Sequence, residues 1–441
     1  MCSGLRHELL QSNGFDLGIY DQVAWQLAHG LEPRSSLLGL HHLGNHAAWG
    51  FGALALPYAV QASPHWLLLI QALALAFTAL PLAELARQHG LNQRLQVAVA
   101  LLWWLQPQVF NANLFDFHPE VMAMPALAGC LLVRPRSHPS SIWLWLALLA
   151  WLLACRDGLA LVVMGLGLRE AVLGRHKAAL IAAALGCGWI LMLSQWLYPW
   201  LNGPGRGPAA LQRFSHLGSS IPEILMAALV KPQQFLLSLQ PGDILIYLVL
   251  ISASTALFWR RASLATLLAA LPLVAVNAIS SSASQRDLVH HYNLPIAVIA
   301  VAAACEGLAA AGQRAWPWRR LGLSALLWAA LAKPWFFTGP YLTRLPLQQE
   351  FQQVKPLISA DAAVLTNSHL APHLSHRRHL YFMGQAERAD PLKGVDTVLL
   401  QPPDPGWASS TAEQRRLLHQ LQQNGWNCRR WPSQLELCRK P

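Results

Sequence analysis

The sequence predicts an all-α polytopic membrane bundle of about ten transmembrane helices, followed by a small extracytoplasmic α/β domain. Hydrophobic residues make up 54% of the 441 residues and charged residues only 12%. Long apolar runs recur at regular intervals up to about residue 338, which is typical of polytopic helical membrane proteins. Beyond that point, short apolar, β-branched runs such as AAVLT and DTVLLQ alternate with polar stretches. This change of pattern predicts strands and an exposed helix, at 411–424, outside the membrane.

These patterns predict that the chain has three parts. Residues 1–63 are expected to form a first extracytoplasmic loop with juxtamembrane helices, residues 64–338 the transmembrane helical domain, and residues 339–441 the extracytoplasmic α/β domain. The apolar segment 46–62 contains Pro57 and two glycines, so we interpret it as a juxtamembrane or re-entrant helix rather than a full span.

The transmembrane domain contains ten candidate spans. They are residues 64–86, 95–112, 118–133, 139–155, 157–170, 177–200, 243–259, 262–280, 291–311 and 319–337. A helix that crosses a bilayer needs about 20 apolar residues. The runs 118–133 and 157–170 are shorter than that, so they are expected to be tilted, broken or re-entrant.

The charges predict the orientation of the bundle. The net charge is +11, but the basic residues fall in short clusters between apolar runs, such as Arg260–Arg261 and Arg319–Arg320. Such clusters mark cytoplasmic loops and argue against nucleic acid as a partner. Of the thirteen acids before residue 340, only Glu84, Glu170 and Glu306 fall on that side. Polar chemistry is therefore expected on the opposite, extracytoplasmic face.

Two of the seven cysteines, Cys428 and Cys438, flank a short turn near the C-terminus. They would form a disulfide if this region faces an oxidising compartment, and remain thiols otherwise. Four others, Cys130, Cys155, Cys187 and Cys305, lie in or beside apolar runs and are interpreted as small core residues.

Five polar motifs share the extracytoplasmic face. They are FDLGIYDQ with Asp16 and Asp21, HHLGNH with His42 and His46, FDFHPE with Asp116, His118 and Glu120, the pair Arg156-Asp157, and RDLVHHY with Arg286, His290, His291 and Tyr292. Each motif also has a purely structural interpretation.

Asp16 can cap a helix, and Pro119 and Glu120 suit the first turn of one. Arg156 and Asp157 can neutralise each other, and the histidines can be interfacial. The spacing HH-x₃-H is not specific for a metal, so no metal site is predicted.

Taken together, these residue types favour a transfer reaction. Carboxylates suit deprotonation or orientation of an acceptor. Arginine and histidine suit a phosphate leaving group, and an apolar bundle beside them suits a lipid tail. The combination indicates transfer of a group from a lipid-phosphate donor.

The motifs FDLGIYDQ, LGNH, FDFHPE, RDGLAL, HHYNLPI and APHLSHRRHLY occur in this order. Over roughly residues 14–440, the chain resembles the DUF2079 family of predicted bacterial membrane proteins. That family is placed in the GT-C superfamily of integral-membrane glycosyltransferases. The resemblance implies a GT-C-like fold in the bacterial plasma (inner) membrane and a polyprenyl-phosphate-linked sugar as donor. The resemblance specifies neither an acceptor nor a certain cofactor. It also does not specify whether a divalent cation is needed or what the oligomeric state is.

The resemblance also implies roles for individual residues. Asp16 is expected to be the catalytic base, with Asp21 as the second candidate. The expected acids and bases of the cavity are Asp116, His118, Glu120 and Asp157. The expected ligands of the donor phosphate are Arg156, Arg286, His290, His291 and Tyr292, with His42 and His46 in a neighbouring loop.

The start of the chain departs from the family pattern. Relatives carry a transmembrane helix before the FDLG segment, whereas only fourteen polar residues precede Phe15 here. Without such a helix, Asp16 is expected to lie on an untethered arm. Two alternatives therefore stay open beside the glycosyltransferase: an inactive scaffold for the C-terminal domain, and a transporter or flippase. Transporters place ionisable groups near the bilayer midplane, often in internal repeats, whereas these acids lie at loop ends.

Overall fold

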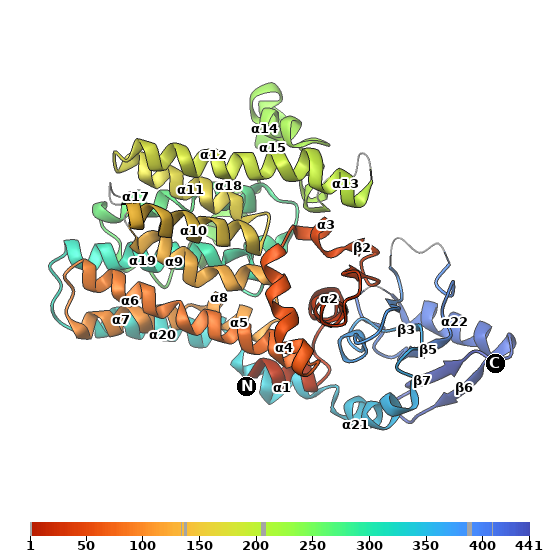
Figure 1. The fold of residues 1–441 in the computed structure, drawn as a ribbon. Helices are drawn as coiled ribbons and strands as arrows, with labels where there is room; N and C mark the ends of the chain where they lie inside the picture. The colour runs from red at the N-terminus through yellow and green to blue at the C-terminus, as the bar shows by residue number, and fades with distance from the viewer. Residues whose placement is uncertain (1, 134, 136–138, 204–208, 386–389, 408) are drawn as a thin grey trace.

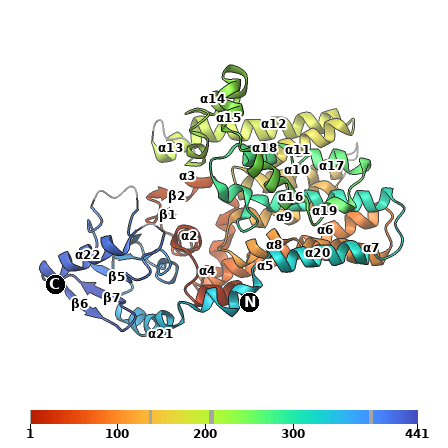
Figure 2. The same cartoon turned by 180° about the vertical axis from the view of Figure 1, so that it is seen from behind.

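The computed structural model describes residues 2–133, 135, 139–203, 209–385, 390–407 and 409–441. A long helical bundle makes up most of the molecule, and a five-stranded sheet lies beyond one end of it (Figure 1). The first 60 residues lie between the two, and α2 (Ile19–Ala28) is between the bundle and the sheet in both views (Figures 1 and 2).

Short elements make up the N-terminal segment. They are α1 (Cys2–Glu8), the π-helical turn η1 (Gly14–Gly18), α2, β1 (Arg34–Ser35), β2 (Leu40–His41), α3 (His42–His46), η2 (Trp49–Leu54) and α4 (Ala55–Val60). Helix α2 is buried on two sides. Leu17 of η1 with Tyr20 and Val23 of α2 pack into the core of the bundle, whereas Ile19 packs into the core of the α/β domain. The N-terminal segment therefore joins the two cores.

Helices or pairs of helices occupy all ten predicted spans. They are α5 (His65–Phe77), α6 (Ala79–Gln88), α7 (Gln93–Trp104), α8 (Pro107–Leu114), η3 (Pro119–Ala123), α9 (Met124–Leu132), α10 (Pro139–Cys155), α11 (Leu159–Val172), α12 (His176–Met192), α16 (Pro241–Ser252), α17 (Leu264–Leu268), α18 (Leu271–Ile279), α19 (Leu294–Ala310) and α20 (Trp318–Leu331). Shorter turns and helices connect them: η4 (Leu193–Leu197), α13 (Tyr198–Asn202), η5 (Ala209–Phe214), α14 (Ile221–Val230), α15 (Pro232–Ser238), η6 (Ala256–Phe258), η7 (Arg261–Ser263), η8 (Ala283–Arg286) and η9 (His291–Asn293).

The predicted number of about ten spans is not confirmed. Among the described residues, three helices are long and apolar enough to cross a membrane: His65–Gln88, His176–Asn202 and His291–Ala310. A fourth span results if the pair Arg261–Leu268 and Leu271–Ile279, bent by 62°, is counted as one. The remaining apolar helices are shorter. The run 95–112, for example, is interrupted where Pro107 begins α8, because proline cannot continue the preceding helix.

Helix α19 lies at the centre of the bundle. Every residue from Leu294 to Leu308 is buried, as expected for a helix that is apolar on all sides. Its N-terminal end follows directly on His291 and Tyr292, so the packing of α19 places these two side chains at the end of the bundle that faces the sheet.

The α/β domain begins after η10 (Pro334–Thr338) and η11 (Pro340–Leu342). It contains α21 (Leu345–Val354), η12 (Lys355–Leu357), β3 (Val364–Thr366), η13 (Ala371–His373), β4 (Leu380–Phe382), β5 (Thr397–Leu400), α22 (Thr411–Gln423), β6 (Asn427–Arg430) and β7 (Glu436–Arg439). The strand order is β4-β3-β5-β7-β6; β3 is parallel to β4 and β5, and β7 is antiparallel to β5 and β6. The predicted exposed helix is α22, which begins with a capping box of Ser410 and Glu413. The predicted hairpin is β6–β7, with Cys428 opposite Cys438 and a disulfide between them.

Candidate functional site

Seven of the sequence-predicted residues come together at the end of the bundle that faces the sheet. We call this group the histidine–arginine cluster; its members are Asp16, His46, His118, Glu120, Arg156, Asp157 and His291. They come from five separate parts of the chain, namely η1, α3, the η3 turn, the α10–α11 connection and η9. The structure therefore brings these seven residues together at one end of the bundle.

The most accessible acid of the cluster is Asp16, and it is paired with His118. The Asp16 Oδ1 atom lies 3.2 Å from His118 Nε2, and the two side chains are 24% and 5% exposed. The other ring nitrogen, His118 Nδ1, lies 3.0 Å from the carbonyl oxygen of Asp116. Carbonyl and carboxylate oxygens only accept hydrogen bonds, so both ring nitrogens face acceptors and the imidazolium form of His118 is favoured.

The environment keeps Asp16 ionised. Burial by itself raises the pKa of the Asp16 carboxyl, but the charge and hydrogen bond of His118, with contributions from His290 and Arg156, outweigh this effect and hold the pKa below its ordinary value. The carboxylate therefore carries a negative charge at neutral pH and remains partly open to an incoming group.

In the deeper part of the cluster, Arg156 contacts three other members. Its Nη1 atom donates to Glu120 Oε2 and lies 2.9 Å from His291 Nε2, while its Nη2 atom lies 3.2 Å from His46 Nε2. His291 Nε2 is also 3.1 Å from Glu120 Oε1. This nitrogen has two alternative partners: it accepts from Arg156 or donates to Glu120. The His291 proton therefore has two possible positions.

The imidazole rings of His118 and His291 lie against each other and connect the Asp16–His118 pair with the residues around Arg156. The ring centroids of His118 and His291 are 3.6 Å apart, at an interplanar angle of 30°. Two charged imidazoliums at this distance would repel each other, so a protonated His118 favours a neutral His291. Within the described residues, the buried Nδ1 atom of His291 has no hydrogen-bond partner, which leaves it available to a ligand.

Asp157 is held at the edge of the cluster. Its carboxylate accepts from the Tyr198 hydroxyl at 2.7 Å and from the Gly158 amide at 2.7 Å, and it lies 3.4 Å from His46 Nδ1. The alternative of a self-neutralising Arg156–Asp157 pair is not favoured, because their closest charged atoms are 4.0 Å apart while Arg156 binds Glu120 directly.

One candidate phosphate ligand was missed by the sequence analysis. The guanidinium carbons of Arg213, in η5, and Arg156 lie 5.0 Å and 5.7 Å from the centre of the Tyr292 ring. The aromatic ring of Tyr292 thus has two arginines beside it. A signal for Arg213 does exist in the sequence: it lies in a loop on the predicted extracytoplasmic side, where the positive-inside rule disfavours arginine.

Two predicted acids lie apart from the cluster and are fully buried. Asp21 accepts from Tyr58 at 2.5 Å and from Ser375, and it lies 3.0 Å from His376 Nε2. Asp116 accepts from Arg6 at 2.7 Å and from the Asn13 amide at 2.8 Å. These contacts describe a structural position for both carboxylates; their chemical roles stay predictions.

Two predicted phosphate ligands, Arg286 and His290, and the predicted loop residue His42 have local partners instead. Arg286 donates to the carbonyl oxygens of Asn277 and Ser280 at the end of α18. His290 Nδ1 lies 2.7 Å from Asp287 Oδ2, and its ring lies 5.0 Å from Phe115 beside the cluster. His42 contacts the Ala48 carbonyl oxygen at 3.1 Å, and burial lowers its pKa to about 4.

The expectation that Asp16 lies on an untethered arm is wrong. The amide of Gly14 donates to the Ser368 carbonyl oxygen at 2.6 Å, and Asn13 contacts both Asp116 and Trp407. The approach of the chain at Gly14 is so close that a Cβ there would lie 2.6 Å from that of Ala371, so glycine is required. Contacts with the C-terminal domain thus hold the loop on the N-terminal side of Asp16.

The cluster does not have the geometry of a metal centre. Across the described residues, no group of three or more His, Cys, Asp or Glu side chains is arranged to hold a metal ion. The sequence prediction named no metal ligand, and this observation adds none.

A bundle of apolar helices with a buried polar cluster at one end is typical of an integral-membrane protein. The chain belongs to the DUF2079 family of predicted membrane proteins, whose family model matches residues 6–437. No curated protein matches the chain.

Two solved structures resemble the fold. One is ArnT from Cupriavidus metallidurans bound to undecaprenyl phosphate, with a TM-score of 0.55 and 12% sequence identity over 99% of this chain and 95% of that chain. The other is ArnT from the same organism in the apo state, with a TM-score of 0.47 and 13% identity over 97% and 93% of the two chains. At this level of identity, the likeness establishes the fold and not the activity.

Proposed function

We propose that the protein is a GT-C-like glycosyltransferase that transfers a sugar from a polyprenyl-phosphate donor to an acceptor at the outer face of the bacterial inner membrane. The α/β domain is then extracytoplasmic. The observation that carries this proposal is the continuous series of contacts from a partly exposed carboxylate, Asp16, through His118 and His291 to the buried Arg156. A proton acceptor and a cation for a leaving phosphate are thereby placed at the two ends of one cluster.

The chemistry is a single displacement at the anomeric carbon. Asp16 accepts the proton of the acceptor hydroxyl as its oxygen bonds to that carbon. The bond between the carbon and the donor phosphate oxygen breaks, and the electron pair leaves with the polyprenyl phosphate. Negative charge therefore moves from Asp16 to the phosphate, and groups that stabilise the second charge accelerate the step.

Three groups suit the phosphate. Arg156 and Arg213 flank Tyr292, and arginine forms paired, charge-assisted hydrogen bonds with phosphate oxygens. The free Nδ1 of His291 is buried next to Arg156 and can donate a third bond when it carries the proton. The ArnT structure with undecaprenyl phosphate supports the choice of lipid, since it shares this fold.

The test uses the full chain in lipid nanodiscs with a labelled undecaprenyl-phosphate-linked hexose and a bacterial envelope extract as acceptor. Release of undecaprenyl phosphate together with labelled product supports transfer. The control for Asp16→Asn is Asp361→Asn, which changes an exposed acid outside the cluster. Transfer that survives Asp16→Asn contradicts the assignment of the base. Passage of the labelled lipid across a vesicle membrane without any transfer favours a flippase instead.

A further inference from the structure

A polar pocket of about 500 Å³ lies outside the histidine–arginine cluster, between the N-terminal segment and the α/β domain. Gln26 and Arg34 line it on one side, and Arg378, His379, Tyr381 and Gln385 line it on the other. Neither the fold comparison nor the proposed transfer step gives this pocket a role.

The pocket contains one buried and one half-buried glutamine, each with a carboxamide oxygen that has unused hydrogen-bonding capacity. Gln26 is only 4% exposed; its Nε2 donates to the Arg34 carbonyl oxygen at 2.9 Å, whereas its Oε1 has no partner in the described part of the chain. Gln385 repeats the arrangement: Nε2 donates to the Ser36 carbonyl oxygen at 2.9 Å, and within the same described ranges Oε1 has no partner. An unpaired buried acceptor is destabilising, because it has lost its hydrogen bonds to water. Hydroxyl groups of a ligand would supply the missing donors.

The charges of the pocket favour an anion. Among the described residues of the lining, the only acid is Glu32, and it is already paired with Arg34 at 3.2 Å. Arg378 is exposed and, within the described residues, forms no ion pair. Next to it, the rings of His379 and Tyr381 are close to parallel, at 17°, and offer a flat aromatic surface. Amide oxygens, an aromatic surface and an unpaired arginine together match a sugar chain that carries carboxylate or phosphate groups.

The walls of the pocket are preformed. Gln22 of α2 donates to Ser36 Oγ at 2.8 Å and to the Arg377 carbonyl oxygen at 3.0 Å. Ser36 Oγ in turn donates to the Leu380 carbonyl oxygen at 2.8 Å. These bonds fix the loop of the N-terminal segment to the strand that carries Tyr381, so a ligand binds without first ordering the site.

We propose that this pocket binds an anionic oligosaccharide, namely the part of the acceptor that is remote from the reacting hydroxyl. The identification as acceptor rests on the proposed function; the binding of the sugar chain does not. Gln26 lies ten residues after Asp16 along η1 and α2, which corresponds to about 15 Å of helix. A chain of several sugar rings spans that distance, so one end occupies the pocket while the other reaches Asp16.

The test measures binding of two probes of equal length, tetragalacturonic acid and the uncharged maltotetraose, to the full chain in nanodiscs by calorimetry at low salt. We expect saturable binding of tetragalacturonic acid only. Its affinity should fall about tenfold in Arg378→Ala, because a charge-assisted hydrogen bond is lost, and by a smaller factor in Gln26→Leu. Arg415→Ala removes an exposed arginine of α22 outside the pocket and should bind like the wild type.

Three results overturn the proposal: no saturable binding of tetragalacturonic acid, equal binding by Arg378→Ala, or equal losses in Arg378→Ala and Arg415→Ala. Equal binding of maltotetraose overturns the anionic class. Arg378 is exposed, so its variant keeps the test valid even if Gln26→Leu does not fold. Asp16→Asn should bind the probe normally. Binding without transfer therefore contradicts only the proposed function, and transfer without binding contradicts only the pocket.

Discussion

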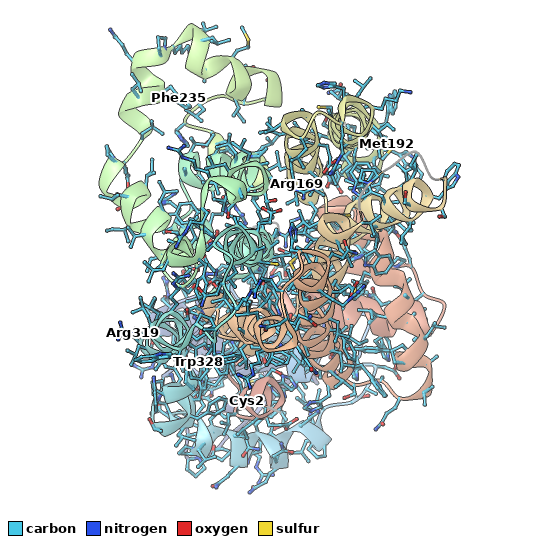
Figure 3. The ribbon with its side chains drawn as sticks, turned by 90° about the vertical axis from the view of Figure 1, so that its left-hand side faces the viewer. Cys2, Arg169, Met192, Phe235, Arg319 and Trp328 are labelled. Carbon is cyan, nitrogen blue, oxygen red and sulfur yellow. A yellow bond between two sulfur atoms is a disulfide. The ribbon has the colours of Figure 1, made fainter. Side chains whose placement is uncertain are left out.

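The two ends of α11 carry two groups of buried charges that differ in their composition. At one end is the histidine–arginine cluster; at the other, roughly 18 Å away along the helix, is a group formed by Arg169, Glu170, Arg175, Thr266 and Glu306. We call the second group the Arg169 cluster. Figure 3 looks onto the end of the bundle remote from the α/β domain and labels Arg169 among the helices there.

The Arg169 cluster is balanced and closed. Two arginines face two glutamates: Arg169 and Arg175 donate to Glu170 at 2.6 Å and 2.7 Å, and Thr266 donates to Glu306 at 2.7 Å. The histidine–arginine cluster has three acids to one arginine and depends on histidine protonation for its balance. It also retains an unpartnered His291 nitrogen. The Arg169 cluster has the features of a structural ion cluster, whereas the composition of the histidine–arginine cluster suits a site that binds and moves charge.

The largest expected effect separates activity from stability. Asp16→Asn should lower the rate of sugar transfer by about 10²–10⁴-fold, because the base can no longer accept a proton. Its free energy of unfolding should change by about 1 kcal/mol or less, because Asp16 is partly exposed and loses one ion pair. Initial transfer rates and thermal unfolding in nanodiscs measure the two quantities. A large loss of stability in Asp16→Asn would contradict the interpretation that the histidine–arginine cluster contributes mainly to activity and the Arg169 cluster mainly to stability.

The opposite pattern is expected for the Arg169 cluster. Arg169→Met leaves Glu170 and Glu306 without the cation that they share, which should lower the free energy of unfolding by about 3–5 kcal/mol. The transfer rate per folded molecule should stay within about twofold, since no contact reaches the distant cluster. Denaturant titration and the rate per folded molecule check this. A variant of normal stability but low activity would show that the two ends of α11 are coupled.

A smaller effect is expected at Arg213. Arg213→Ala should weaken binding of undecaprenyl phosphate about tenfold, equivalent to about 1.4 kcal/mol, by removing one charge-assisted contact with the phosphate. Native mass spectrometry of the protein with the lipid measures the affinity. Arg319→Ala is the matched control, since Arg319 lies at the end of the bundle seen in Figure 3. Equal losses in both variants would indicate general electrostatic attraction and exclude a specific role for Arg213.

The smallest effect concerns the buried carboxylate of Asp21, at the contact with the α/β domain. Burial by itself lowers the pKa of His376, but the charge and hydrogen bond of Asp21 outweigh it and raise the pKa above the ordinary value. The stabilising contribution of protonated His376 is then complete below the unfolded pKa of about 6.5 and disappears as the pH rises through the folded value.

The melting temperature of the wild type should therefore fall on raising the pH above about 6.5, and this fall should be smaller in His376→Gln. The pKa of Asp21 is lowered despite its burial, chiefly by His376, so the contribution of Asp21 is lost only as the pH falls below about 4. Melting curves over a pH series measure both the loss of stability above about pH 6.5 and the loss below about pH 4. If the melting temperature of His376→Gln falls as steeply above about pH 6.5 as that of the wild type, the fall is not caused by His376.

Local patterns made much of the fold predictable. Apolar runs located helices in every predicted span, Ser410 and Glu413 mark the start of α22, and the spaced cysteines indicated the β6–β7 hairpin. The lengths of the spans were not predictable to the same degree. Bends and breaks, such as the 62° bend between α17 and α18, depend on packing against other helices.

The cluster was predictable in its membership but not in its pairings. Charge patterning placed Asp16, His118 and Arg156 on one face, yet the pairing of Arg156 with Glu120 rather than Asp157 follows from the approach of two distant turns. The tether of the first loop depends on contacts between residues about 350 positions apart, as between Asp21 and Ser375. No local pattern in the sequence reports such contacts.

The contact between Gly14 and Ser368 has a consequence for biosynthesis. The ribosome makes Asp16 about 350 residues or more before Ser368, Ser375 and Trp407, which hold its loop. A nascent chain therefore contains the carboxylate long before anything fixes its position. A chain released before residue 368 would therefore lack the contacts that hold the loop of Asp16, even with every helix of the bundle complete.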